Sequence, residues 1–345
     1  MTTVLDAGQL MGDLEGASPR EAFRRALVEL ARRDPRIYCI DSDVGGFEES
    51  FGAELPEQYV NVGIAEANLV GVAAGLAASG KIPFVSTIAT LLVMRGADQL
   101  KIDVAGSALP VKIVVTHGGF SAGHLGPTHH SLEDLALMRA LPNVTVIVPA
   151  DAAQAVHAVV AAVELEGPVY LRLGRNETDR VPDGGAPFVV GQVRVLRPGG
   201  DVTIAGCGTY PLLTALAAAA RLEEEGVDAR VLDVHTLQPL DWPALVLAAQ
   251  ETAGIVAVED HGPIGGLRSA IAEVVSQLSP CPVVPVGIEY GFHDHVGNHR
   301  QLLEAAGLTT DHVTEAARML AARARSQSTC GNMAAQVPRP DQTNA

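Results

Sequence analysis

The sequence predicts an α/β fold with two domains, each a parallel sheet packed between two layers of helices. Short runs rich in Val, Ile and Leu alternate along the chain with helical stretches, as βαβ units require. The residues are 48% hydrophobic but only 4% aromatic, a composition typical of parallel sheets whose strands are buried on both faces. The length of 345 residues exceeds that of most single cores, which favours two domains.

The first domain is expected at residues 18–177, after an N-terminal arm of residues 1–17. Its first helix begins at Ser18, Pro19 and Glu21, which offer a capping hydroxyl, a proline in the first turn and a capping carboxylate. This helix is predicted to end near Arg33. The strands predicted after it are 37–40, 60–62, 82–86, 111–116, 144–148 and 169–173, and the helices between them are 65–79, 91–105, 132–140 and 151–164.

The second, smaller domain is expected at residues 201–325, after a linker at 178–200 that is rich in Pro, Gly and Asp. Its predicted strands are 202–206, 229–234, 255–259 and 283–286, with helical stretches between them. Residues 326–345 are polar with scattered Pro and Gly and are predicted to form a disordered tail.

The net charge of −16 argues against binding to nucleic acid or anionic lipid, because both are usually bound through clustered Lys and Arg. No segment approaches the roughly 18 consecutive apolar residues of a membrane span. We therefore expect a cytoplasmic protein. The four cysteines lie far apart without a CxxC pair, which argues against a zinc site and a disulfide framework.

Polar residues directly after predicted strands are the candidates for function, because ligands of open parallel sheets bind at the carboxyl ends of the strands. Glu66 lies in such a place, at the start of a helix rich in Ala and Gly. A carboxylate there can simply interact with the helix dipole. The apolar surroundings of Glu66 also predict a desolvated carboxyl, which makes it a catalytic candidate.

A cluster of histidines follows the predicted strand 111–116. His117, His124, His129 and His130 fall within one glycine-rich stretch. This stretch can be a structural loop or a metal site, because imidazole is the commonest metal ligand. No carboxylate or cysteine shares the stretch, so imidazoles that face a polar substrate are the favoured interpretation.

Two further candidates follow other strands. Arg175 comes after the predicted strand 169–173 and offers a planar fork for phosphate or carboxylate, although an exposed arginine at a strand end is ordinary. Asp41 and Asp43 follow the predicted strand 37–40, and they can equally form an Asx-type turn before two glycines.

Four ordered segments resemble the pyrimidine-binding and C-terminal domains of the transketolase family. The resemblance covers roughly residues 18–320. It implies a thiamine-diphosphate pyrimidine-binding fold followed by a transketolase C-terminal-like domain. The segments are NVGIAEANLVGVAAGLAASGKIPFVST, THGGFSAGHLGPTHHSLEDLALMRALPNVTVIVPAD, LRLGR and VEDHGPIGGL.

This resemblance implies a role for each candidate residue. Glu66 is implied to hydrogen-bond the pyrimidine ring of thiamine diphosphate and so favour the imino form that activates the cofactor. His117 and His129 are implied to contact substrate hydroxyls and assist proton transfer. Arg175 corresponds to a substrate-phosphate arginine, and Asp43 to an acidic residue near the thiazolium.

The diphosphate half of the site is not found in this sequence. Family members fix the diphosphate through a metal bound by a GDG motif, and the chain contains no GDG. The resemblance therefore implies a partner subunit that holds Mg²⁺ (or Ca²⁺ or Mn²⁺) together with the diphosphate, in an expected α2β2 assembly. Substrates would be a small ketose or keto acid donor and an aldehyde acceptor.

Three departures from the family pattern narrow the expected substrate. Ile88 and Leu91 stand where pyrimidine-stacking aromatics are common, and His124 and Leu125 replace an acidic pair that reads the donor. Phe47 stands at the position of a phosphate-contacting serine. We therefore expect a specialised ketol or acyl transfer to a less hydroxylated or unphosphorylated substrate, while Arg175 argues for phosphate.

Two alternatives remain. A β subunit of a 2-oxo acid dehydrogenase first component shares the same two-domain layout, but the GPTHH and LGR segments favour transketolase. A non-catalytic scaffold subunit is disfavoured by the retention of Glu66, because a buried carboxylate without a ligand is unfavourable.

Overall fold

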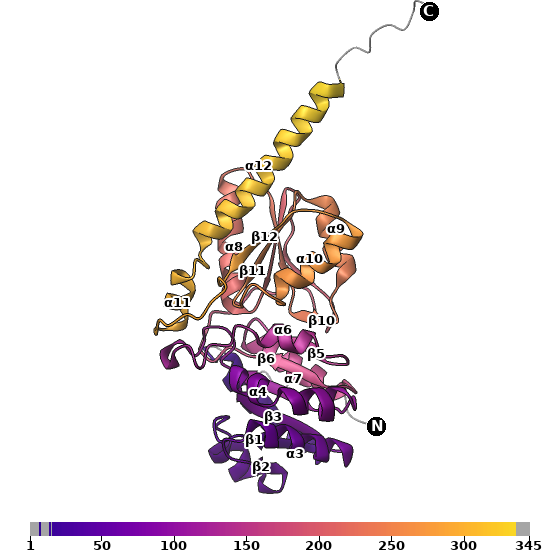
Figure 1. The fold of residues 1–345 in the computed structure, drawn as a ribbon, viewed down its shortest axis with the longest axis vertical. Helices are drawn as coiled ribbons and strands as arrows, with labels where there is room; N and C mark the ends of the chain where they lie inside the picture. The colour runs from indigo at the N-terminus through magenta and orange to yellow at the C-terminus, as the bar shows by residue number, and fades with distance from the viewer. Residues whose placement is uncertain (1–6, 8–13, 15, 336–345) are drawn as a thin grey trace, which may run out of the picture.

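The computed structural model of the chain describes residues 7, 14 and 16–335. Two α/β domains stack along the long axis of the molecule, with the first domain lower and the second above it in Figure 1. This arrangement confirms the predicted fold class. Most of the predicted N-terminal arm lies outside the described residues.

The first domain contains a seven-stranded sheet with the order β10-β5-β6-β4-β3-β1-β2. Its strands are β1 (Ile37–Asp41), β2 (Tyr59–Asn61), β3 (Ile82–Ile88), β4 (Lys112–Thr116), β5 (Thr145–Ile147), β6 (Val169–Arg172) and β10 (Thr236–Gln238). All neighbours are parallel except β10, which is antiparallel to β5. Because β10 belongs to the second domain in sequence, the second domain completes the sheet of the first.

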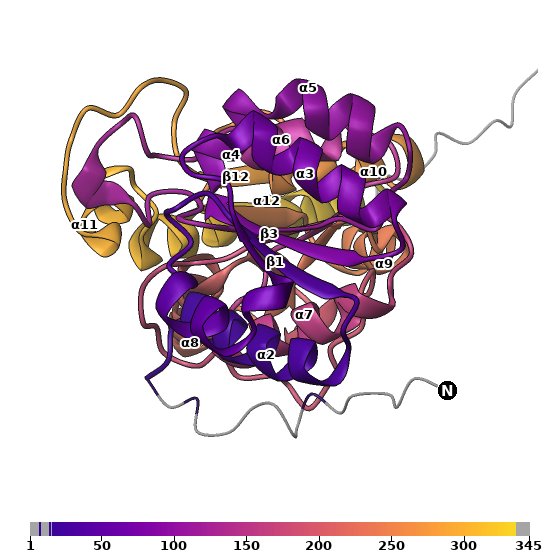
Figure 2. The same ribbon diagram turned by 90° about the horizontal axis from the view of Figure 1, so that it is seen from below.

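Helices cover both faces of this sheet, with α3, α4, α5 and α6 on one face and α2 and α7 on the other (Figure 2). They are α2 (Pro19–Arg33), α3 (Glu66–Ala78), α4 (Ala89–Arg95), α5 (Ala97–Gln99), α6 (Asp134–Arg139) and α7 (Ala152–Glu164), with short turns η1 (Glu48–Gly52), η2 (Pro56–Gln58), η3 (Leu100–Ala105) and η4 (Gly123–Leu125). Helix α2 begins as predicted, because Ser18 Oγ accepts the Glu21 N–H at 3.1 Å. The predicted capping role of the Glu21 carboxylate is wrong, because this carboxylate instead accepts a bond from Arg25 Nε at 3.0 Å.

The second domain contains a five-stranded sheet with the order β12-β11-β8-β9-β7. Its strands are β7 (Arg194–Arg197), β8 (Val202–Cys207), β9 (Ala229–Asp233), β11 (Ile255–Glu259) and β12 (Val283–Gly287). Its helices are α8 (Thr209–Glu224), α9 (Trp242–Glu251), α10 (Leu267–Leu278), α11 (His299–Ala305) and α12 (Thr310–Ala335). Only β7 runs antiparallel to its neighbour in this sheet.

Two predicted irregular segments contain regular structure. The predicted linker at 178–200 includes β7, which pairs with β9. Val181 of this segment is buried, and its backbone N–H donates a hydrogen bond to the Asp151 carboxylate. The predicted disordered tail from residue 326 is helical as far as Ala335, because no proline interrupts α12 before Pro338. Residues 336–345 lie outside the described part of the chain.

One buried apolar cluster runs through both domains and includes Val115 of β4, Ala205 of β8 and Leu245 of α9. Separate clusters fill the α2/α7 side of the first sheet and the α8/α12 side of the second. The shared cluster fixes how the carboxyl ends of the first sheet face the second domain. Within the described residues, no helix combines the length and hydropathy that a membrane span needs.

Candidate active site

The candidate residues follow strands that are neighbours in the first sheet. Asp43 follows β1, Glu66 follows β2, His117 follows β4 and Arg175 follows β6. Because these strands run parallel, the residues gather along one edge of the sheet. They form two groups, one around Glu66 and one around His117.

Glu66 is buried at 2% exposure in the first turn of α3. Its Oε2 accepts a bond from Arg95 Nη1 at 3.0 Å, and the Arg95 side chain is 53% exposed. Its Oε1 is buried and has no hydrogen-bond partner in the described part of the chain. An unsatisfied buried acceptor is costly, so Glu66 leaves a place for a donor from a bound group.

The residues predicted to surround the pyrimidine belong to β3 and α4. Ile88 is buried at the end of β3, and Leu91 is half-buried in α4, the helix that also carries Arg95. Both side chains are aliphatic, so they offer packing without aromatic stacking.

The two aspartates at the end of β1 have different environments. Asp41 is buried and its carboxylate accepts the backbone N–H groups of Gly45 (2.7 Å) and Phe47 (3.3 Å) and the Tyr59 hydroxyl (3.4 Å). Asp41 therefore closes a turn, as the structural alternative predicted. Asp43 is exposed, has a φ of 67° and accepts a bond from Asn61. Of the two, Asp43 is the one that a ligand can reach.

The histidine loop, which we define as residues 117–131, brings its imidazoles close to Arg175. Burial, followed by the charge of Arg175, lowers the pKa of His117 to about 3, so this ring is neutral at physiological pH. Its Nδ1 lies 2.7 Å from the Thr116 hydroxyl. His124 lies 2.8 Å from the Arg175 guanidinium, and desolvation followed by this charge lowers the pKa of His124. His129 is half-buried beside Thr128.

Arg20 joins this group, although it is not among the residues proposed from the sequence. Burial, then the charges of Arg24 and Arg175, lowers the pKa of Arg20. The Nε of Arg20 is buried without a hydrogen-bond partner among the described residues. The sequence at the start of α2 predicts only a capping motif. The one feature that could have pointed to Arg20 is its place in the first turn of a helix, because helix N-termini favour anions.

Two predicted substrate-binding residues have other environments. Phe47 is fully buried between Phe23 and Phe51, with ring centroids 5.5 and 6.3 Å away, so it cannot contact a substrate. That prediction is wrong because Phe47 finds an aromatic core on the α2 side of the sheet. Leu125 is exposed at 42% in η4, and its aliphatic side chain offers no polar contact.

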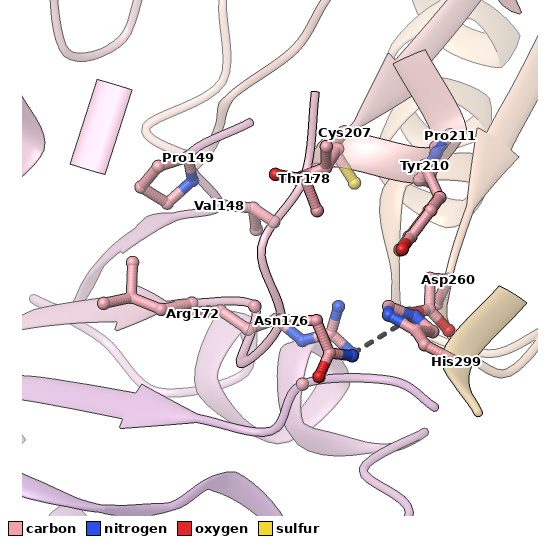
Figure 3. Close-up of a pocket in the computed structure, with 15 residues that line it drawn as sticks. Val148, Pro149, Arg172, Asn176, Thr178, Cys207, Tyr210, Pro211, Asp260 and His299 are labelled. Carbon is pink, nitrogen blue, oxygen red and sulfur yellow. Dashed lines mark hydrogen bonds and ion pairs between the residues drawn. The ribbon is translucent and has the colours of Figure 1, made fainter. Parts of the chain in front are cut away.

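A small cavity of about 40 Å³ lies between the domains, next to the histidine loop (Figure 3). It is lined by Gly118 and Gly174, the neighbours of His117 and Arg175, and by buried Arg172, Asp260 and His299. Both domains therefore contribute to this end of the site. Within the described residues, no group of three His, Cys, Asp or Glu could hold a metal ion.

Comparisons with known proteins place both domains in one family. Residues 15–180 match the family model of the transketolase pyrimidine-binding domain, and residues 191–313 match that of the transketolase C-terminal domain. The chain is 39% identical over 306 residues to a 6-deoxy-6-sulfo-D-fructose transketolase subunit of Clostridium sp. (strain MSTE9), covering 88% of this chain and 94% of the relative. It is 38% identical to one subunit of an apulose-4-phosphate transketolase from Phocaeicola vulgatus, covering 86% and 96% of the two chains.

The fold is also similar to solved structures. A split-gene transketolase, described as an inactive beta4 tetramer, superposes with a TM-score of 0.80 at 43% identity and covers 88% of this chain and 98% of that chain. The match thus spans nearly the whole length of these separate subunits. The chain therefore belongs to the transketolase family of thiamine-diphosphate-dependent enzymes, as a subunit that contains the pyrimidine-binding and C-terminal domains.

Proposed function

We propose that the chain works with a diphosphate-binding partner subunit, in an α2β2 assembly, to move a two-carbon ketol unit from an anionic ketose to an aldehyde. The observation that carries the proposal is the buried Glu66 Oε1, which lacks a partner among the described residues. Thiamine diphosphate, when bound, would supply the electron sink that carbon–carbon bond cleavage and formation require. The unsatisfied Glu66 acceptor fits a donor nitrogen of this cofactor, and Ile88 and Leu91 would pack against its ring.

The chain's own residues would divide the remaining work. Neutral His117 can accept a hydrogen bond from, or donate one to, a substrate hydroxyl without an ionic cost, because its pKa of about 3 keeps it uncharged. His129 would contact the same substrate, and Asp43 would lie near the thiazolium. The Mg²⁺ (or Ca²⁺ or Mn²⁺) that binds the diphosphate would be held by the partner.

An anionic substrate is favoured by the charges around the histidine loop. Burial, then the charges of Arg24 and Arg175, lowers the pKa of Arg20, and a bound anion would relieve the repulsion among these cations. His124 accepts a bond from Arg175 and so lies beside this guanidinium. Phe47, which argued against phosphate in the sequence, lies in the core and does not bear on the question. The relatives that belong to 6-deoxy-6-sulfo-D-fructose and apulose-4-phosphate transketolases serve enzymes of anionic sugars, which is consistent with an anionic substrate here.

A partner subunit is supported by an exposed apolar groove that spans both domains. The groove has a volume of about 590 Å³ and continues from Met94 on α4, next to Arg95, to Ile264 and to Tyr290 and Phe292 in the second domain. Tyr290 and Phe292 are 83% and 93% exposed. Large exposed aromatic side chains usually mark an interface. We also propose that the protein is cytoplasmic, as expected from its sequence.

The test is to assemble the chain with a GDG-containing subunit and measure ketol transfer. Fructose 6-phosphate and fructose serve as matched donors with glyceraldehyde 3-phosphate as acceptor, and we expect the phosphorylated donor to be preferred at least about tenfold. Arg175→Gln should remove most of this preference, whereas Arg221→Gln on the exposed surface of α8 should not. Decarboxylation of pyruvate without ketose turnover would support the 2-oxo acid dehydrogenase alternative, and failure to bind thiamine diphosphate would support a scaffold.

A further inference from the structure

The histidine loop has a narrow neck. Gly119 and Ser131 pair as an isolated antiparallel bridge, in which each N–H donates to the other carbonyl at 3.0 Å. The segment between them carries His124, His129 and His130. A loop whose two ends are joined to each other by one bridge can tilt as a unit, so the position of these imidazoles depends on what holds the neck.

A carboxylate of the second domain holds one side of the neck. The Phe120 N–H donates to Asp260 Oδ1 at 3.1 Å, and Asp260 follows β11, 140 residues away in sequence. A Cβ on Gly119 would collide with this carboxylate, and the φ of Gly119 is +59°. Glycine at this position therefore lets Asp260 approach the backbone directly.

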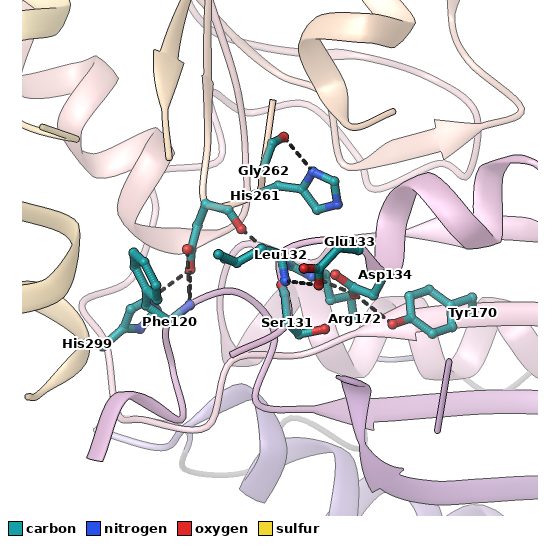
Figure 4. A network of polar contacts seen from close by, with 11 residues as sticks. Phe120, Ser131, Leu132, Glu133, Asp134, Tyr170, Arg172, His261, Gly262 and His299 are labelled. Carbon is teal, nitrogen blue, oxygen red and sulfur yellow. Dashed lines mark hydrogen bonds and ion pairs between the residues drawn. The ribbon is translucent and has the colours of Figure 1, made fainter. Parts of the chain in front are cut away.

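The other side of the neck is joined to the same aspartate by Arg172 (Figure 4). Arg172 Nη2 donates to the carbonyl of Ser131 at 2.9 Å and to the carbonyl of Asp260 at 3.0 Å. The Asp134 carboxylate fixes the guanidinium from the first domain, with Nε at 2.9 Å. The Asp260 carboxylate is in turn held by His299 Nε2 at 2.7 Å.

The tip of the loop touches the same region of the second domain. The Gly297 N–H donates to the Gly123 carbonyl at 3.3 Å, and the backbone of Gly123 packs closely against Leu302 of α11. Gly123 directly precedes His124, which bonds Arg175. Neck and tip are thus both contacted by residues 260 and 297–302 of the second domain, in addition to Arg172 of β6.

We propose that Asp260, supported by His299 and Arg172, is a positioning residue that sets the tilt of the histidine loop relative to Glu66. The second domain would then act on substrate geometry through the histidine loop. The kinetic part of this inference rests on the proposed function, whereas the loop order does not. A displacement of about 1 Å in such a site can lower the rate about a hundredfold.

A matched control must separate loop positioning from simple domain docking. Asp233 offers this control, because it is fully buried in β9 and accepts a bond from Gln154 of the first domain at 2.7 Å. Its bonds do not involve the histidine loop. Asp233→Asn and Asp260→Asn therefore alter two buried interdomain carboxylates by the same chemical change, but only one of them contacts the loop. Desolvation raises the pKa of Asp233 to about 7, so the variants are compared at pH 8.

The first measurement is hydrogen exchange of the full-length chain, followed by mass spectrometry of peptides from residues 117–132. We expect Asp260→Asn to accelerate exchange in these peptides by about tenfold or more, since a hydrogen bond to a charged group is lost. Peptides around Glu66 should exchange at the original rate. Asp233→Asn should leave the loop peptides unchanged.

The second measurement is ketol transfer by the assembled pair. Asp260→Asn should lower kcat/KM for the ketose by about 10- to 100-fold and leave the Kd for thiamine diphosphate within about twofold. His299→Leu should act in the same direction, and His299→Gln should restore part of the rate because its amide can still donate to Asp260. The His299 pair keeps the test available if Asp260→Asn fails to fold.

Two results would overturn the inference. One is unchanged loop exchange in both Asp260→Asn and His299→Leu. The other is equal acceleration of loop exchange by Asp233→Asn, which would show that any loosening of the domains is sufficient. An assembled wild-type pair without transfer activity would refute the proposed function, while the exchange results would still decide whether the second domain holds the loop.

Discussion

Replacing Glu66 with Gln separates the stability of the chain from its cofactor chemistry. The change removes the charge that pairs with Arg95, but this arginine is half-exposed, and such pairs contribute about 0–1 kcal/mol. Oε1 has no partner to lose within the described residues. We therefore expect Tm of the isolated chain to shift by no more than about 2–4 °C.

The same substitution should have a large effect on the cofactor. An uncharged amide in place of a carboxylate weakens a charge-assisted hydrogen bond that is worth about 1.5–3 kcal/mol. This corresponds to an increase of about 10- to 150-fold in the Kd of thiamine diphosphate. Turnover should be abolished, because the amide cannot share the proton as the carboxyl does, while the pair stays assembled.

The assay combines calorimetric titration of thiamine diphosphate into the assembled pair with thermal unfolding of the chain. Glu259→Gln is a matched control, since Glu259 is also buried at a helix N-terminus but accepts the N–H groups of Leu267 (2.6 Å) and Arg268 (3.1 Å). Burial raises the pKa of Glu259 to about 7, so both variants are compared at pH 8.

The two variants should show opposite patterns. Glu259→Gln should lower the stability by about 1–3 kcal/mol and leave cofactor affinity unchanged, because an amide supplies only one acceptor oxygen. Wild-type turnover in Glu66→Gln, or equal cofactor affinity in it and the parent, would refute the role assigned to Glu66.

Three further predictions concern the histidine loop and the core. Phe47→Ser should lower the free energy of unfolding by about 3–5 kcal/mol, measured by urea denaturation, without raising kcat/KM for phosphorylated donors, because the side chain lies in the core. Gly119→Ala should lower Tm and accelerate exchange of the loop, since its Cβ would meet the Asp260 carboxylate; an unchanged Tm would contradict the close approach. His117 should remain neutral from pH 8 to pH 5 in ¹⁵N NMR spectra. Its folded-state pKa of about 3 lies below the ordinary 6.5, so the unfolded chain binds this proton first as the pH falls. The contribution of His117 to the free energy of unfolding therefore decreases from about pH 6.5 to about pH 3. A midpoint of titration near 6.5 would show that the ring is exposed.

Much of the fold could be predicted because local patterns specify it. Ten of the twelve strands in the two sheets were expected within a few residues, since runs of Val, Ile and Leu between helical stretches already indicate βαβ units. The strands β7 and β10 were not expected. β7 lies in a segment rich in Pro and Gly, and β10 is three residues long and pairs with a strand from the other domain.

Candidate site residues could be predicted only where they come shortly after a strand. Glu66, His117 and Arg175 could be proposed because each comes shortly after a strand of a parallel sheet. The environments of Phe47 and Asp260 could not be predicted from the sequence, because each depends on partners that are distant in the chain. Phe47 packs on Phe23 of α2, and Asp260 bonds a backbone N–H 140 residues earlier. Sequence spacing carries no information about such contacts.

The pairing of β10 with β5 restricts where this polypeptide can be divided. A fragment that stops within residues 178–200 would lack β10 and leave the hydrogen-bonding edge of β5 open to other chains. Such a fragment should aggregate or exchange strands rather than stay monomeric. The complementary fragment would carry β10 without its sheet. Any engineered separation of the two halves must therefore keep residues 236–238 with the N-terminal piece, or replace them with a new edge that repels pairing.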